Sequence, residues 1–149
     1  MLPTSRGSIT LASSNPSDAP IIDPNYYATE FDRVLFRTGI RKVIQLMLGT
    51  SEGQSFVASE MPPPGFEPLG LDASDAEIDA RVRRAANTFY HPAGSAAMGS
   101  VVDTDLKVYG IGGLRVVDAS ILPVAICAHY QVPVYALAEQ AADIIKNAG

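Results

Sequence analysis

Cysteine and histidine are both scarce in this chain of 149 residues, which holds one cysteine and two histidines. A single cysteine excludes a disulfide within the chain and a cysteine-rich zinc site. Cys127 is therefore expected to be a small buried apolar side chain, with a catalytic thiol as the minor alternative because His129 lies two residues away. Two histidines without clear partner carboxylates do not supply the three or four ligands of a metal centre, so no metal is expected.

Basic runs and long apolar runs are also missing. The net charge is −5, whereas nucleic acids and anionic membranes attract basic surfaces, so neither is an expected partner. No apolar stretch approaches the roughly 20 residues that cross a bilayer. The first residues lack the basic segment and apolar run that mark a signal peptide. The length suffices for one domain with a real core.

Local patterns predict a mixture of short strands and longer helices. Residues 7–12 alternate apolar and polar side chains, which is typical of a half-buried strand, and residues 114–119 read as a buried strand. A helix is expected to begin after Thr29, which can cap it, and to stop at Gly49. The inward face of that helix is expected to comprise Phe31, Val34, Leu35, Thr38, Val43, Leu46 and Met47. Its basic face is expected to be solvated and comprises Arg33, Arg37, Arg41 and Lys42.

Two further helices are predicted beyond an irregular, proline-rich connector over residues 50–70. The first begins at Ser74, where Ser74 and Glu77 match a capping box. Its inner stripe is expected to be Ile78, Val82 and Ala85. The second has Pro133 in its first turn. Its apolar face is expected to be Val134, Leu137, Ala138, Ala141, Ile144 and Ile145.

The two histidines stand in the two most distinctive stretches. His91 opens HPAGSAAMG, and His129 lies in a turn just before the last predicted helix. Imidazole is the side chain best suited to moving protons near neutral pH, so the question is whether the fold brings the two rings together.

A serine nucleophile at Ser95 has little support, because the elbow pattern G-x-S-x-G is missing. The glycine-rich GIGG at 110–113 precedes a predicted strand and is interpreted as a turn.

Asp118 ends the stretch that reads as a buried strand and is followed by small residues. Ligands of open α/β sheets bind beyond the carboxyl ends of strands, but Asp118 could equally cap a turn. The helix after Pro133 could present its amide dipoles to an anionic cofactor near residues 130–134, and His129 would then stand next to that cofactor.

Four stretches in order resemble the C-terminal region of the glucose–methanol–choline (GMC) oxidoreductases. Within that family they are similar to fungal aryl-alcohol oxidases and pyranose dehydrogenases. They are SRGSITLASSNPSDAPIIDPNYY, HPAGSAAMG, GGLRVVDASILP and HYQVPVYALAEQAADIIK. The resemblance implies an α+β fold: the end of an antiparallel-sheet substrate domain over residues 1–100, then the last strand and helix of an FAD domain over residues 101–149. Ser95 replaces a threonine common in the family and keeps its hydroxyl.

The resemblance also implies a chemistry, in which an alcohol gives its hydroxyl proton to a histidine and its hydride to FAD. His91 matches the expected base, and His129 matches the second member of the pair, although the two roles could be reversed. The residues expected to touch FAD are Asp118, Ala119, Tyr130 and Gln131. The implied partners are a small alcohol and an electron acceptor, either dioxygen or a quinone.

One departure from the family is large. The GxGxxG motif that binds the FAD diphosphate is not in this sequence, so the Rossmann half of the FAD domain is expected to be absent. The isolated chain is then expected to be inactive and not to hold FAD stoichiometrically, and the apolar faces meant for the missing N-terminal half are expected to be exposed. The alternative function is a non-catalytic orphan fragment or an association module.

Overall fold

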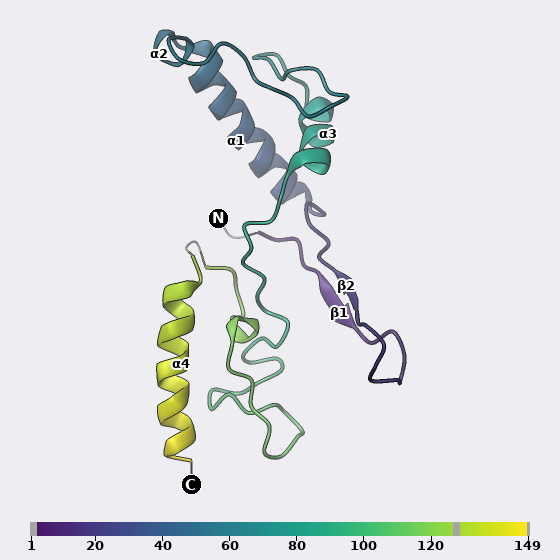
Figure 1. The fold of residues 1–149 in the computed structure, drawn as a ribbon, viewed down its shortest axis with the longest axis vertical. Coiled ribbons are helices and arrows are strands. Elements are labelled where there is room, and N and C mark those ends of the chain that lie inside the picture. Colours follow the sequence, from purple (N-terminus) through teal and green to yellow (C-terminus); the bar gives the residue numbers. More distant parts are fainter. Residues whose placement is uncertain (1–2, 127–128, 149) are drawn as a thin grey trace. The chain divides into compact units, whose positions relative to one another are not determined.

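The computed structural model describes residues 3–126 and 129–148, so Cys127 and its predicted burial lie outside the described residues. The chain forms two compact units (Figure 1). Unit 1 consists of Met1–Pro3, Gly7–Pro24 and Phe89–Gly149, and unit 2 consists of Thr4–Arg6 and Asn25–Thr88. Across the described residues, helices predominate and one two-stranded antiparallel sheet is present, which agrees with the expected α+β class.

Unit 2 contains the helices α1 (Glu30–Gly49), α2 (Ser51–Gln54) and α3 (Asp75–Ala85). The predicted caps are confirmed, because Thr29 accepts a hydrogen bond from Asp32 N at 3.3 Å and both bonds of the Ser74 capping box form. The short helix α2 lies in the connector that was predicted to be irregular. It forms because Thr50 Oγ1 accepts from Gly53 N at 3.0 Å and so caps its first turn.

The core of unit 2 differs from the predicted one. Its buried apolar side chains are Tyr27, Ile44, Leu69, Ile78 and Val82, with Ile40 and Leu48 packed against them. The predicted inward face of α1 is wrong, since Phe31, Val34, Val43 and Leu46 are each at least half exposed. Ala85, predicted to be part of the inner stripe of α3, is also exposed.

Ion pairs explain which face of α1 turns toward α3. Arg37 Nη2 lies 2.5 Å from Asp79 Oδ2, and Arg41 Nη2 lies 2.6 Å from Asp75 Oδ1. The prediction of a solvated basic face is therefore wrong for Arg37, whose side chain is 13% exposed, whereas Arg41 is 42% exposed. The hydrogen bond from Arg37 holds the pKa of Asp79 well below its usual range. The same side of the helix carries Ile44, which is buried, and Ile40, which packs against the core.

A buried carboxylate fixes the first residues of unit 2. Asp32 accepts from Thr4 N at 2.9 Å, from Ser5 N at 2.8 Å and from Thr4 Oγ1 at 3.1 Å. Burial opposes the ionisation of Asp32, but the hydrogen bonds from Ser5 and Thr4 outweigh it and hold its pKa well below the usual range. Asp32 thus joins α1 to a segment far from it in sequence.

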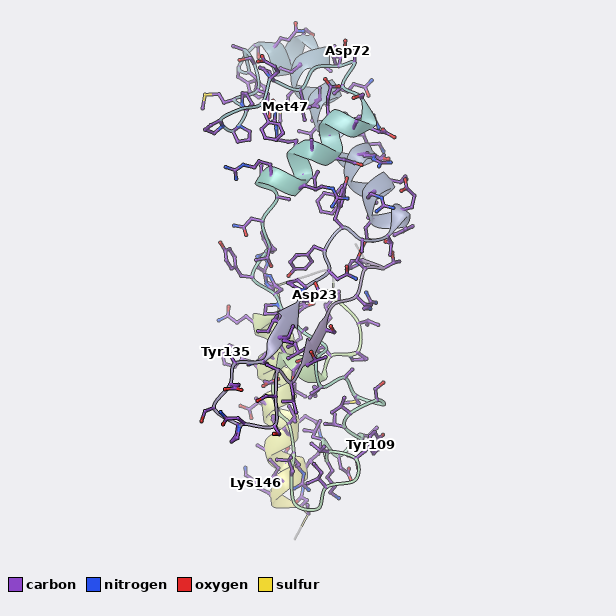
Figure 2. All side chains as sticks on the ribbon, turned by 90° about the vertical axis from the view of Figure 1, so that its right-hand side faces the viewer. Asp23, Met47, Asp72, Tyr109, Tyr135 and Lys146 are labelled. Carbon is purple, nitrogen blue, oxygen red and sulfur yellow. The ribbon has the colours of Figure 1, made fainter. Side chains whose placement is uncertain are left out.

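Unit 1 begins with a hairpin of β1 (Ser8–Thr10) and β2 (Ile21–Asp23), paired antiparallel with Ile9 opposite Ile22. Asp23 at the end of β2 is labelled in Figure 2. A strand was predicted here, but its half-burial is wrong, because both strands are exposed along their whole length. Two strands alone cannot bury a face, so Ile9 and Ile22 remain 55% and 64% exposed.

The rest of unit 1 packs around α4 (Gln131–Lys146). Its core consists of Val102, Leu106, Ile121 and Ala141, with Leu137 and Ile144 of α4 against it. The predicted face of α4 is confirmed for Leu137, Ala141 and Ile144. Ala138 and Ile145, which were also predicted to belong to it, are exposed. Among the described residues, no helix is both long and apolar enough to cross a bilayer.

The buried strand predicted at residues 114–119 is wrong. The segment makes only one isolated bridge, from Arg115 to Lys107, and Leu114 is 46% exposed. The reason is that no neighbouring strand pairs with it within the described residues, so an apolar run that suits a sheet remains irregular. The predicted turn at 110–113 is confirmed, with Gly110 and Gly113 at positive φ.

Candidate active site

The two histidine rings lie next to each other in unit 1. The ring centroids of His91 and His129 are 5.3 Å apart, and the ring planes meet at 67°. His91 is half-buried and His129 is exposed. Imidazole can accept or donate a proton, and rings at this separation can approach one hydroxyl group from two sides. The arrangement is therefore suited to proton transfer with a small ligand.

Two other aromatic rings border the pair. Phe89 stacks on His91 with centroids 5.2 Å apart and planes at 16°, and it lies 5.1 Å from His129. Tyr130 meets His91 edge to face at 5.0 Å. Tyr130 was predicted as a site residue, but Phe89 was not. Nothing in the sequence signalled Phe89, because the stack depends on a left-handed residue, Tyr90 at φ +60°, between the two rings.

The loop that carries His91 is tied to the turn that follows Asp118. Ala96 N donates to Ser120 O at 2.9 Å, and Met98 N donates to Ile121 O at 2.9 Å. Gly94 has φ +88°, and a Cβ atom there would lie 3.3 Å from Leu122 O. Glycine therefore suits both the left-handed backbone and the close approach. Two of the four motifs are held together in this way.

Asp118 caps the 3₁₀ turn η1 (Ala119–Ile121) instead of ending a strand. Its Oδ1 accepts from Ser120 N at 2.7 Å, and the hydrogen bonding of Ser120 lowers the pKa of Asp118 below its usual value. The interpretation of Asp118 as a turn cap is confirmed. Its carboxylate is also exposed, and Ala119 beside it is half-buried.

The N-terminal end of α4 adjoins the pair, since Tyr130 is the N-cap residue. Its carbonyl oxygen accepts from Val134 N at 2.9 Å, and its side chain makes no cap hydrogen bond. Gln131 opens the helix and is exposed, so the helix starts two residues before Pro133. A helix start carries partial positive charge, which favours a negatively charged group beside Tyr130 and Gln131.

Comparison with known proteins identifies this arrangement of motifs. A family model described as "GMC oxidoreductase" matches residues 3–138. The chain belongs to the GMC oxidoreductase family. It corresponds to the C-terminal region of these proteins, and the resemblance stated from the sequence is confirmed.

Several relatives show how much of a GMC protein this chain represents. The GMC-type oxidoreductase acuG of Aspergillus aculeatus is 48% identical over 145 residues, which are 97% of this chain and 28% of acuG. The solved structure of an FAD-dependent oxidoreductase from Chaetomium thermophilum is 32% identical, with a TM-score of 0.79 over 94% of this chain and 24% of its own. A solved fungal aryl-alcohol oxidase is 35% identical, with a TM-score of 0.74 over 93% of this chain and 23% of its own. The chain therefore spans about a quarter of the length of these GMC proteins.

Proposed function

We propose that this chain is the part of an FAD-dependent alcohol oxidoreductase that carries its acid–base histidine pair. The observation that carries the proposal is the 5.3 Å separation of the His91 and His129 rings. Further support comes from relatives, since solved structures of an FAD-dependent oxidoreductase and of an aryl-alcohol oxidase share this fold. The electron acceptor of such an enzyme is dioxygen or a quinone.

In the proposed mechanism, an alcohol places its hydroxyl group between the two imidazoles. His91 accepts the hydroxyl proton, because an alkoxide releases hydride more readily than a neutral alcohol does. His129 donates a hydrogen bond to the same oxygen and holds it in place. The half-buried position of His91 and its edge contact with Tyr130 suit the base role, since both fix the ring. FAD, when bound, supplies the acceptor for the hydride.

The described residues fit one border of a flavin site. The N-terminal turn of α4 offers its amide dipoles beside His129, and the exposed Asp118 and Gln131 offer polar groups that could contact FAD. Ala119 and Tyr130 complete the proposed set. The diphosphate of FAD would need a glycine-rich loop of the GxGxxG kind, which this sequence does not contain. In the proposed division, residues 1–100 belong to a substrate domain and residues 101–149 to the FAD domain.

A chimera tests this function. Replacing the matching region of acuG by this chain would give one polypeptide that joins the histidine pair to the part of a GMC oxidoreductase that this chain does not cover. Stopped-flow absorbance would then follow anaerobic flavin reduction by a panel of primary alcohols that includes benzyl alcohol. His91→Ala should slow the reduction about 100-fold or more, because general-base catalysis contributes about 10²–10⁴. His129→Asn, which keeps a hydrogen-bond donor, should slow it less.

The control for these variants is Gln140→Ala, an exposed position on α4 away from the rings. It should reduce flavin at the parent rate. If His91→Ala reduces flavin as fast as Gln140→Ala does, His91 is not the base. If both histidine variants behave like the control, the pair has no role in the reaction.

Exposed apolar surface favours a second candidate function, that of an association module. Large apolar side chains are exposed in both units, among them Leu11 at 84%, Phe31 at 57% and Val132 at 76%. Such surface is typical of regions that pack against further protein. The chain should then bind the separately expressed remainder of acuG and should purify without flavin. One FAD per isolated chain, measured by its absorbance band, would contradict the second expectation.

A further inference from the structure

Phe89 is the ring that contacts both histidines. It stacks on His91 at 5.2 Å and 16°, and it lies tilted against His129 at 5.1 Å and 53°. We propose that Phe89 is the positioning residue of the histidine pair, holding the two imidazoles at their mutual separation of 5.3 Å. The catalytic meaning of this role rests on the function proposed above, whereas the ring geometry does not.

The stack restricts how His91 can turn. The His91 ring lies nearly parallel to the ring of Phe89. The ring of Tyr130 also contacts His91, edge to face, with centroids 5.0 Å apart. Rotation of the imidazole about its side-chain bonds would break the parallel stack. His129 stands on an exposed loop position, so its contact with Phe89 is a constraint on an otherwise open side chain. One phenylalanine thus orients both rings.

The backbone between Phe89 and His91 is unusual in a way that serves this stack. Tyr90 has φ +60°, in the left-handed region that bulky residues rarely adopt. The stack of Phe89 on His91, with centroids 5.2 Å apart, is thus formed across a left-handed residue and not along a regular strand. Such strained residues cluster at functional sites.

The exposure of Phe89 supports a role beyond core packing. Phe89 is 71% exposed and is not part of the buried core of unit 1, whereas its ring lies within 5.2 Å of both imidazoles. A proton acceptor must stand within hydrogen-bond reach of the hydroxyl, and a displacement of about 1 Å can cost about 10²-fold in rate. Loss of the contacts that hold both rings in place should therefore lower the rate of the reaction by a large factor.

Nuclear magnetic resonance of the 149-residue chain tests the geometry, because only two histidines give imidazole signals. Wild-type chain should show nuclear Overhauser effects from the Phe89 ring protons to both imidazoles. Phe89→Leu should move both histidine Cε1–H signals, since the ring current is lost, while Phe89→Tyr should keep them near their wild-type positions. Phe56→Leu is the matched control, because Phe56 is 72% exposed and lies in unit 2. It should move neither signal.

The chimera with acuG tests the catalytic part. Phe89→Leu should lower the limiting rate of flavin reduction about 10- to 100-fold and change the apparent alcohol affinity less, and Phe89→Tyr should restore most of the rate. Missing Overhauser effects in the wild-type chain would overturn the geometry, even if Phe89→Leu failed to fold. An unchanged reduction rate in Phe89→Leu would overturn the positioning role. A wild-type chimera that cannot be reduced by alcohols would instead refute the proposed function, while the ring contacts would still be measured in the chain alone.

Discussion

His91 and His129 meet edge to face, with ring centroids 5.3 Å apart, although they belong to different loops of unit 1. The first loop is fixed by hydrogen bonds from Ala96 and Met98 to the turn at residues 120–121. The second leads directly into α4, whose Ala141 belongs to the same core as Ile121. A single small core therefore holds the elements that carry both loops.

The left-handed backbone at Tyr90 should be necessary for the stack of Phe89 on His91. Tyr90→Pro fixes φ near −65°, so it should abolish the Overhauser effects between these two rings. Tyr90→Gly removes the same side chain but permits φ +60°, so it should retain them. Equal spectra for the two variants would show that the backbone conformation does not matter for the stack.

Asp32 should be important for stability in unit 2. Asp32→Ala removes the charged acceptor of the Thr4 N and Ser5 N hydrogen bonds, and a hydrogen bond to a charged group contributes about 1.5–3 kcal/mol. Urea unfolding followed by circular dichroism should show a loss of that order. Asp72→Ala, at an exposed carboxylate, is the control and should change the stability by less than about 0.5 kcal/mol.

The lowered pKa of Asp32 predicts that the stability of the fold depends on pH. Because the folded pKa of Asp32 is lowered, its stabilisation is present above the ordinary aspartate value near 4 and is lost as the pH falls below it. Asp79 should add to this loss of stability at acid pH, because its folded pKa is lowered too. The wild-type chain should therefore lose stability below about pH 4, and Asp32→Ala should show a shallower slope there. Parallel slopes would contradict the assignment.

Tyr27 should make the stability of the fold decrease at alkaline pH. Burial, together with the hydrogen bond of 2.7 Å that its hydroxyl donates to Asp79, raises the pKa of Tyr27 from 10.0 to about 12. The folded state therefore favours the protonated phenol, and its contribution is complete below pH 10 and lost as the pH rises toward 12. Tyr27→Phe should flatten the loss of stability over this range, whereas Tyr26→Phe, at a 68% exposed ring, should leave it unchanged.

Features that depend on neighbouring residues in the sequence were predictable. The caps at Thr29 and Ser74 were found because each cap uses an amide two or three residues away. The turn at Gly110 and Gly113 was found because glycine is the residue for positive φ. The end of α1 at Gly49 was also predicted, but Gly49 is helical and the cap residue is Thr50 in extended backbone.

Features that depend on distant partners were not predictable in the same way. The buried face of α1 is the one from which Arg37 reaches Asp79, a contact across 42 residues that periodicity alone does not reveal. Residues 114–119 have strand-like composition but no pairing strand within the described chain. Motif resemblance located His91 and His129, whereas Phe89 emerged only when the rings were seen together.

The most direct test of the histidine pair is a double-mutant cycle in the chimera with acuG. The rate of anaerobic flavin reduction by one alcohol would be measured for the parent, for His91→Ala, for His129→Ala and for the double variant. Residues that act as a unit on one proton have strongly non-additive effects, so the double variant should be about as slow as the slower single variant. If the two effects multiply in the double variant, or if neither single variant is slowed, His91 and His129 do not act as one acid–base pair.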